Sequence, residues 1–352
     1  MGDPQPAISL YLDGELSFQL HRKGFAGTIP TLKLQMHDNK NPATLVIDGY
    51  RSSEKNFSLT HAIQRGLFEL FDAETNTKIA VPQVNEEIEA GKMVVPAGAR
   101  NQWFDLKIDA REDFWTQLLT PGHKYEIRWA KSGHEPRAYH GETEEVSEET
   151  NRLSVRCLPR PIKLTVFDDA TAPPQFSLSL TPTAKICHLS GEPRFGFSLE
   201  VTSHEAEVIT VCLHKTPLKE LHGLEEIAKV EDVETDEEVE WPYGIGCYDG
   251  PESFPSNDFF EEFEPGVPYQ RTFYLEKYDK KTSNGGELEA LESGSIYKVE
   301  VSKDLLRAFT KWRKGRKGDL LGSDQKENEA RWKGNSGQII LEVSNPFTFE
   351  TA

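Results

Sequence analysis

The sequence predicts an all-β protein made of two tandem β-sandwich domains, produced by an internal duplication, with a few short helices in the connections. Three observations support this prediction. Many segments alternate between apolar and polar residues, a glycine-containing turn motif recurs, and landmarks of the first half return in the second. The chain has 352 residues with 26 Gly and 21 Pro, which suits two domains of ordinary size with many turns.

Alternating segments occur along the whole chain. In the first half they are residues 8–12, 16–20, 32–36, 125–129 and 162–166, and in the second half residues 176–180, 195–201, 297–301 and 339–343. Successive side chains of a strand point to opposite faces, so each segment can bury one face and expose the other. The apolar run at residues 208–213 is typical of a central strand.

Two segments have helical features. Residues 302–312 begin with Ser302, a candidate N-cap, and carry apolar residues at helical spacing. Thr216-Pro217 can open a short helix, because proline is favoured in the first helical turn. We expect both helices to lie in connections between strands.

A turn motif places an apolar residue three positions before a glycine and a tyrosine three positions after it. Its copies contain Gly122 and Tyr125, Gly266 and Tyr269, and Gly294 and Tyr297, and a degenerate copy contains Gly98. Glycine adopts backbone conformations that other residues avoid. A tyrosine at such a corner can bury its ring and return its hydroxyl to an upstream backbone group.

The first copy, Leu119-Thr-Pro-Gly122-His-Lys-Tyr125-Glu-Ile127, resembles the tyrosine corner of fibronectin type III domains. The resemblance covers about nine residues per copy. It implies an immunoglobulin or fibronectin type III-like sandwich topology, and it implies nothing about function.

Landmarks of the first half recur in the second. Asp72 begins an Asp-x-Glu-Thr turn that returns at Asp232, 160 residues later. Pro30 resembles Pro193, and residues 162–166 resemble residues 339–343. Apart from the proline pair, the offset grows along the chain from 160 to 177, as expected if loops of the second copy gained residues. The polar, proline-rich residues 168–174 predict a boundary between domains at residues 1–170 and 171–352.

Charge is segregated within the second half. Residues 220–264 hold 16 Asp or Glu against Lys229 alone, and residues 303–333 hold ten Lys or Arg against five acids. In one interpretation, the acidic insertion complements the basic stretch of its own domain. In another, these residues bind a basic partner protein; the candidate residues are Glu234, Asp236, Glu237, Glu238, Lys311, Arg313, Lys314, Arg316 and Lys317.

Three further interpretations concern the same residues. Asp232, Glu234 and Asp236 offer alternating oxygen ligands for calcium, but the glycine and closing glutamate of a calcium loop are missing. Residues 311–317 can form a nuclear import signal or nucleic-acid patch. They can equally form the last turn of a helix followed by a glycine turn. A Trp followed by Lys and Gly also occurs at Trp129, which favours a packing role for Trp312.

Four residues of the second half are weak candidates for a metal site: Cys187, His188, Cys212 and His214. Cys212 and His214 point to the same face of a strand, at a spacing that suits zinc. A supporting Cys-x-x-Cys pair is missing, and free cysteine is a common buried residue. We therefore expect no metal and no cofactor.

The sequence lacks a phosphate-binding loop, a His-Glu-x-x-His zinc motif and a Gly-x-Ser-x-Gly nucleophile elbow. A net charge of −18 argues against general binding to nucleic acid or anionic membranes. The N-terminus lacks the features of a secretory signal, so we expect a cytoplasmic protein, with the nucleus as the alternative.

We expect a non-enzymatic protein-interaction or scaffold protein. The alternative is a hydrolase or a carbohydrate-active or carbohydrate-binding protein that uses loop carboxylates between the domains. In that case a sugar-stacking groove could be lined by Trp103, Trp115 and Trp129. The other interpretation is that these three side chains are buried in the core.

Overall fold

The computed structural model describes residues 7–37, 40–51, 56–82, 91–108, 111–131, 135–141, 152–219, 223–235, 237–242, 254–278, 285–334 and 336–352. Strands dominate this part of the chain, and its helices have at most seven residues. The predicted all-β class is therefore confirmed. The chain forms two compact units, Met1–Lys23 with Gly27–Ala172, and Gly24–Ala26 with Pro173–Ala352.

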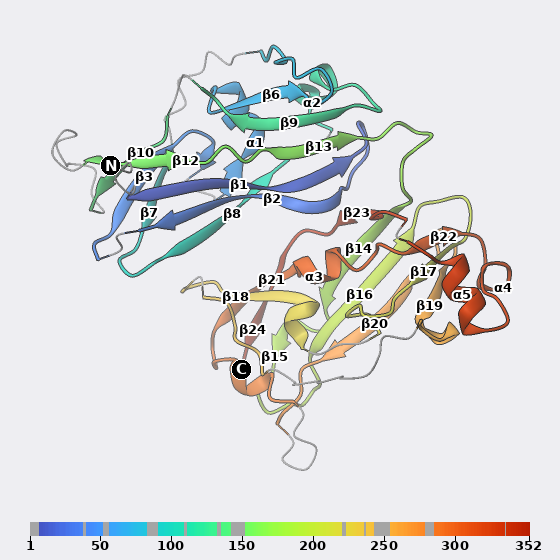
Figure 1. The fold of residues 1–352 in the computed structure, drawn as a ribbon. Coiled ribbons are helices and arrows are strands. Elements are labelled where there is room, and N and C mark those ends of the chain that lie inside the picture. Colours follow the sequence, from blue (N-terminus) through green and yellow to red (C-terminus); the bar gives the residue numbers. More distant parts are fainter. Residues whose placement is uncertain are drawn as a thin grey trace. The chain divides into compact units, whose positions relative to one another are not determined.

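In the first unit, one sheet has the strand order β4-β5-β8-β2-β1-β13-β9-β6, and a second has the order β11-β10-β3-β7 (Figure 1). Its elements are β1 (Ile8–Phe18), β2 (Ala26–Met36), β3 (Ala43–Ile47), β4 (Tyr50–Arg51), β5 (Asn56–Ser58), α1 (Leu59–Gln64), β6 (Phe68–Asp72), β7 (Gly91–Val95), β8 (Asn101–Lys107), α2 (Asp113–Leu118), β9 (Lys124–Trp129), β10 (Arg137–His140), β11 (Arg152–Leu153), β12 (Val155–Cys157) and β13 (Ile162–Val166). The long β1 pairs in parallel with β12 through its first half and with β13 through its second half.

In the second unit, the strand orders are β20-β16-β14-β23, β15-β24-β21-β18 and β19-β17-β22. Its elements are β14 (Gln175–Pro182), β15 (Ile186–Cys187), β16 (Gly196–Ser203), β17 (Ile209–Cys212), η1 (Leu224–Glu226), β18 (Ala228–Asp232), η2 (Asn257–Phe259), β19 (Phe260–Phe263), β20 (Tyr269–Tyr274), η3 (Leu288–Ala290), β21 (Ile296–Val301), α3 (Lys303–Leu306), β22 (Trp312–Lys314), α4 (Lys317–Leu320), α5 (Gln325–Arg331), β23 (Ile340–Val343) and β24 (Phe347–Thr351).

Strand pairing in the second unit repeats that of the first. The antiparallel pair β2–β8 corresponds to β16–β20, β6–β9 to β18–β21, and β9–β13 to β21–β24. The parallel pairs β1–β12 and β1–β13 correspond to β14–β23 and β15–β24. The strand β3, which pairs with β7 and β10, corresponds to β17, which pairs with β19 and β22.

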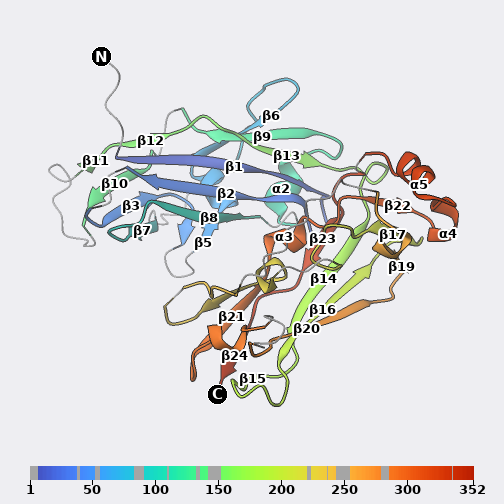
Figure 2. The same ribbon diagram turned by 60° about the horizontal axis from the view of Figure 1, so that its bottom comes forward.

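The small sheet of the second unit is built from three connections. β17 follows β16 along the chain, β19 precedes β20, and β22 follows β21. These three strands meet as the sheet β19-β17-β22 (Figures 1 and 2). Its central strand β17 is buried along its whole length, as predicted for residues 208–213. This sheet brings together residues that lie about 100 positions apart in the sequence.

The tyrosine corner forms in both units. The Tyr125 hydroxyl accepts a hydrogen bond from the Thr120 backbone N–H at 2.8 Å, and the Tyr297 hydroxyl accepts one from the Glu292 N–H at 2.9 Å. Both tyrosines are buried. Gly122 supplies a φ of +84°, which L residues rarely adopt, so glycine is required at this turn. Tyr125 and Tyr297 thus each return their hydroxyl to an upstream backbone group.

The third copy of the motif differs. Gly266 has a φ of +66°, but Tyr269 is only half-buried and begins β20 with its ring against Phe263. Within the described residues its hydroxyl forms no corner bond of the kind made by Tyr125. Tyr269 also differs in its strand: among the described residues β20 pairs with β16 on one side only, while β9 and β21 are flanked on both sides.

The Asp-x-Glu-Thr turns have the same geometry in the two units. Asp72 Oδ1 accepts hydrogen bonds from the backbone N–H groups of Glu74 and Thr75. Asp232 Oδ1 accepts the same two bonds, from Glu234 and Thr235. Each aspartate therefore closes its own hairpin turn, as short polar side chains often do.

Two of the predicted correspondences are wrong. Residues 162–166 form β13, which pairs with β9, whereas residues 340–343 form β23, which pairs with β14. The counterpart of β13 is β24, which pairs with β21. Pro30 lies inside β2, while Pro193 precedes β16. Short apolar strings suit any half-buried strand, so likeness between two of them does not identify equivalent strands.

The predicted helix over residues 302–312 is shorter. Ser302 is its N-cap and accepts a bond from Leu305 N–H, but α3 ends at Leu306 and Trp312 begins a strand. Pairing with β17 overrides the helical spacing there. After Thr216-Pro217 the structure has a turn rather than a helix, and η1 follows further along.

We predict that Tyr125→Phe and Tyr297→Phe each lower the free energy of unfolding by about 1–2 kcal/mol, since each leaves a backbone N–H without its acceptor. Tyr269→Phe is the matched control and should change it by less than about 0.5 kcal/mol. Urea unfolding followed by tryptophan fluorescence measures all three variants. Equal effects at the three positions would contradict the structural role of the corner hydroxyl.

Candidate functional site

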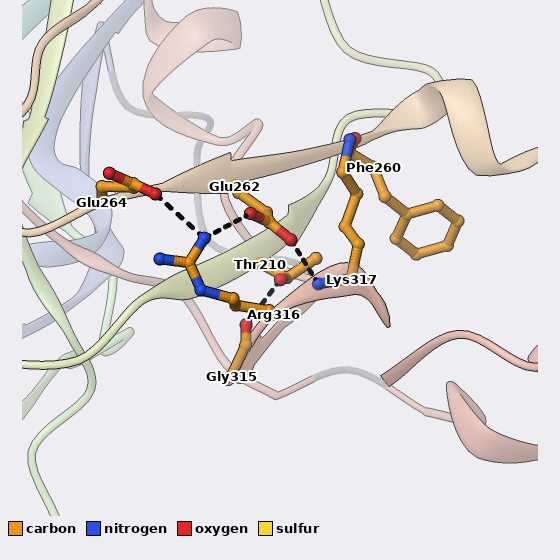
Figure 3. Close-up of polar contacts among 7 residues, drawn as sticks. All are labelled: Thr210, Phe260, Glu262, Glu264, Gly315, Arg316 and Lys317. Atoms are coloured by element: carbon orange, nitrogen blue, oxygen red, sulfur yellow. Dashed lines mark hydrogen bonds and ion pairs between the residues drawn. The ribbon is translucent and has the colours of Figure 1, made fainter. Parts of the chain in front are cut away.

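The small sheet of the second unit joins part of the acidic segment to the basic segment. β17 pairs with β19, which carries Glu261 and Glu262, and on its other side with β22, which leads to Arg316. Thr210 of β17 is buried, and its hydroxyl donates a hydrogen bond to the Gly315 carbonyl at 2.7 Å. This bond positions the chain just before Arg316 (Figure 3).

Two carboxylates converge on the Arg316 guanidinium (Figure 3). Arg316 Nη1 lies 2.9 Å from Glu264 Oε1 and 3.2 Å from Glu262 Oε2. The hydrogen bond and the charge of Glu264 raise the pKa of Arg316 above its usual value. This arginine therefore has its charge matched within its own unit.

Lys317 completes the network. Its backbone N–H, the first of helix α4, donates to Glu262 Oε1 at 2.6 Å, so the glutamate satisfies a helix-terminal donor. Its ammonium donates to the Phe260 carbonyl at 2.9 Å. Lys219 pairs with Glu261 at 3.0 Å. The acids of residues 261–264 thus face cations of the same unit.

The rest of the basic stretch divides into half-buried and exposed positions. Arg313 lies over the Trp332 ring, 5.2 Å from its centroid, and donates to the Trp312 carbonyl. Lys311 and Lys314 are exposed. The Trp312 ring N–H donates to the Gly337 carbonyl at 2.8 Å. Trp129 lies in β9, whose counterpart is β21 and not β22, so the two tryptophans are not equivalent.

The acidic residues that the sequence predicts to bind a partner belong to the hairpin turn after β18. Glu234, Glu237 and Glu238 are exposed there, and Asp236 lies outside the described residues. Hydrogen bonds, the largest from the Thr235 backbone, lower the pKa of Asp232. Its Oδ1 atom closes the turn, as that of Asp72 does in the first unit, which gives it a structural role independent of calcium.

Three exposed apolar side chains lie next to this turn, and we call them the apolar strip: Ile186, Val233 and Ile296, with exposed fractions of 42%, 49% and 46%. Ile186 of β15 and Ile296 of β21 both lie opposite Glu350 of the intervening strand β24. The Val233 N–H donates to the Ile296 carbonyl at 2.9 Å. The strip therefore crosses the outer face of the sheet.

The first unit has no such strip at the equivalent positions. Ser17 and Lys124 both lie opposite Thr165, and the Ala73 N–H donates to the Lys124 carbonyl at 2.9 Å. Ser17 thus occupies the place of Ile186. Lys124 occupies the place of Ile296, and Ala73 that of Val233. The fold does not require apolar side chains there, so the strip is a property of the second unit's surface.

The same face beyond the strip is charged. Lys229 pairs with Glu231, Lys298 with Glu300 at 2.5 Å, and Lys298 reaches Glu231 at 3.8 Å. These cations and anions offset one another on the sheet. The exposed glutamates of the turn therefore lie beside an apolar strip that is crossed by the exposed Glu350 of β24, while the charges of β18 and β21 offset one another.

The weak metal candidates do not form one cluster. Cys187 lies in β15 and Cys212 in β17, which belong to different sheets. Burial raises the pKa of the Cys187 thiol to about 11, and Cys212 packs with Phe260 and Trp332. The His214 ring lies edge-on to Phe259, and His188 is half-buried. Within the described ranges, no three His, Cys, Asp or Glu side chains lie close enough to share a metal.

The three candidate sugar-stacking tryptophans differ in exposure. Trp115 is buried, and its ring N–H donates to the Thr60 hydroxyl at 3.1 Å. Trp129 is half-buried against Phe68. Trp103 is 56% exposed on the outer face of β8, with the Lys33 ammonium 4.3 Å from a ring centroid.

Polar side chains extend the Trp103 surface. Lys33 lies opposite Trp103 in the β2–β8 pair, and Gln35 lies opposite Asn101. The Tyr11 hydroxyl donates to Gln35 Oε1 at 2.8 Å. One face of the first unit thus combines a large exposed ring with hydrogen-bonding groups.

No protein-family model matches the chain, and no curated protein matches it. One similar solved structure concerns neurohormone perception by the receptor tyrosine kinase Torso; it is 4% identical, with 86% of this chain and 69% of that chain covered and a TM-score of 0.14. A structure of the BSP domain of a biofilm-associated protein is 9% identical, with 97% and 58% covered and a TM-score of 0.14. The chain thus spans less than two thirds of that second structure. With TM-scores this low, neither structure assigns a fold or a function.

In the described residues, no helix has the length and apolar character needed to cross a membrane.

We predict that Asp232→Asn lowers the unfolding temperature at pH 7 relative to wild type. A carboxylate whose pKa is lowered by folding stabilises the folded state above its unfolded-state pKa, and this contribution disappears as the pH falls through the lowered value. The difference between the two proteins should therefore shrink steadily below about pH 4. Calorimetry over a pH series measures it, with Glu234→Gln as the control. A difference that is independent of pH would contradict this assignment.

Proposed function

We propose that the protein is a non-enzymatic interaction protein whose second unit binds a basic partner. The observation that carries this proposal is the apolar strip beside the exposed glutamates of the β18 turn. Ile186, Val233 and Ile296 stand where the first unit has Ser17, Ala73 and Lys124. Exposed apolar residues rimmed by charge are typical of protein-binding surfaces.

The charge distribution supports the same surface. The acids of residues 261–264 face Arg316, Lys317 and Lys219. Those acids are therefore less available to a partner than Glu234, Glu237 and Glu238, which are exposed at the turn. A partner segment with lysine or arginine beside an apolar residue matches both features. The acids would steer its approach, and burial of the strip would hold it.

As part of this proposal, the two units are immunoglobulin or fibronectin type III-like domains that arose by duplication. The repeated order of strand pairs supports the duplication. So do the two tyrosine corners and the two Asp-x-Glu-Thr turns. After such a duplication the second copy is free to change its surface while the first preserves the original arrangement.

We predict that binding of a fluorescent peptide of alternating lysine and leucine weakens at least tenfold, about 1.4 kcal/mol, in the triple variant Glu234→Gln, Glu237→Gln, Glu238→Gln. Ile296→Lys should weaken it similarly, because it places a cation in the strip. Fluorescence anisotropy at several salt concentrations measures both. High salt should weaken the wild type more than the triple variant.

Two controls accompany this measurement. Glu74→Gln removes one acid from the equivalent turn of the first unit, and Arg316→Gln releases acids elsewhere in the second unit. Neither should weaken binding of the peptide. Equal binding by wild type, the triple variant and Ile296→Lys would exclude this surface as the binding site.

A second candidate function is carbohydrate binding by the first unit. The 56% exposed Trp103, with Lys33, Gln35 and Tyr11 on the same face, supports it. A sugar ring can stack on an exposed aromatic ring while neighbouring polar groups bind its hydroxyls. This candidate uses a sheet face, whereas the sequence placed the site between the domains.

We predict for this candidate that soluble polysaccharides slow the wild-type protein in affinity electrophoresis and that Trp103→Ala abolishes the effect. The loss of an exposed ring should leave the unfolding free energy within about 0.5 kcal/mol of wild type. Tyr274→Ala, which removes an exposed aromatic residue from the second unit, is the control. Failure of a broad panel of neutral and acidic polysaccharides to slow the wild type would exclude carbohydrate binding.

A further inference from the structure

The outer edge of β20 has no partner strand among the described residues. β20 lies at one end of the sheet β20-β16-β14-β23 and pairs with β16 alone (Figure 2). The Leu275 N–H donates to the Phe195 carbonyl, so the odd-numbered residues of this antiparallel pair are bonded to β16. The backbone groups of Gln270, Thr272 and Tyr274 consequently point away from the sheet. Among the described residues, nothing pairs with them.

Other edges of the second unit are covered or short. Phe25, which belongs to this unit, exchanges two backbone hydrogen bonds with Leu341 of β23. The hairpin after β18 covers that strand, because the Val239 N–H donates to the Val230 carbonyl. β15, β19 and β22 have two, four and three residues. β20 has six residues, Tyr-Gln-Arg-Thr-Phe-Tyr, rich in types that favour strands and free of proline and lysine.

Different charged groups lie near the two ends of β20: an arginine paired with a glutamate at one end, and the Glu200 carboxylate at the other. At its C-terminal end the Arg194 guanidinium lies over the Tyr274 ring, 4.2 Å from the centroid, and pairs with Glu276. At its N-terminal end the Gln270 amide donates to Glu200 Oε2 at 2.9 Å. Both groups lie on the solvent-facing side of the sheet, since Leu199 and Val201 are the buried neighbours of Glu200.

We propose that two copies of the chain associate through this edge, by antiparallel pairing of β20 with β20 about a two-fold axis at Thr272. In this register Gln270 of one copy lies opposite Tyr274 of the other. Glu200 of one copy is then beside Arg194 of the second copy, and the symmetry makes this contact twice. All three outward-facing residues of each strand take part in the new ladder.

Electrostatics favours this register over other antiparallel registers that also have a two-fold axis. A shift that centres the pairing on Arg271 places the two Arg271 side chains opposite each other, which is unfavourable. Pairing centred on Gln270 brings the two Glu200 carboxylates together. Pairing centred on Tyr274 brings the two Arg194 guanidinium groups together. Only the Thr272-centred register combines full overlap with contacts between opposite charges.

The test is sedimentation velocity of the full chain over a wide concentration range. Wild type should form a reversible dimer, and Thr272→Pro should be monomeric at the same concentrations. Proline is tolerated at edge positions whose N–H faces solvent, so this variant should keep the wild-type circular dichroism spectrum. Asn101→Pro, at an outward-facing position of the counterpart strand β8, is the matched control and should still dimerise.

Charge reversal tests the register without proline. Arg194→Glu and Glu200→Arg should each weaken dimerisation at least about tenfold, because each creates a like-charge contact. The double variant should return dimerisation to within about threefold of wild type. A wild type that is monomeric at every concentration, or a dimer that survives Thr272→Pro, would overturn the proposal. Failure of the double variant to recover would overturn the register.

Discussion

Each unit depends on a buried tyrosine that ties the start of a strand to the turn before it. Tyr125 and Tyr297 lie in β9 and β21, which are hydrogen-bonded to a neighbour on both sides. The ring fills the core, and the hydroxyl accepts a backbone N–H that would otherwise lack a partner. Strands β6 and β13 in one unit, and β18 and β24 in the other, are built on this strand.

With that strand held in place, the connections between strands are free to vary. In the second unit, three of them form the sheet β19-β17-β22 and bring Glu262 and Glu264 to Arg316. This network sets an acidic segment against a basic one. The glutamates of the β18 turn are left exposed, and they lie beside the apolar strip. The proposed partner surface follows from this distribution of charge, and the proposed dimer follows from an edge that no other described strand covers.

The two units share residues that the fold requires and differ at positions where the fold permits several residue types. Asp72 and Asp232 make the same turn bonds, so these aspartates serve the fold. Ile296 and Lys124 occupy equivalent places with opposite character, so the residue at this place is not dictated by the fold. The Cys187 and Cys212 thiols lie in different sheets, so these two weak metal candidates are separated.

The sequence by itself determined the all-β class, the buried corner tyrosines 125 and 297, the N-cap at Ser302 and the central strand at residues 208–213. Each of these is a local property, because alternation, a glycine turn or a capping side chain acts within a few residues. Only the tertiary structure decided that Arg316 meets Glu262 and Glu264, that Ile186 and Ile296 share one surface, and that β24 rather than β23 is the counterpart of β13. These facts depend on which strands pair, and pairing brings together residues far apart in the chain, for which no local pattern carries a signal.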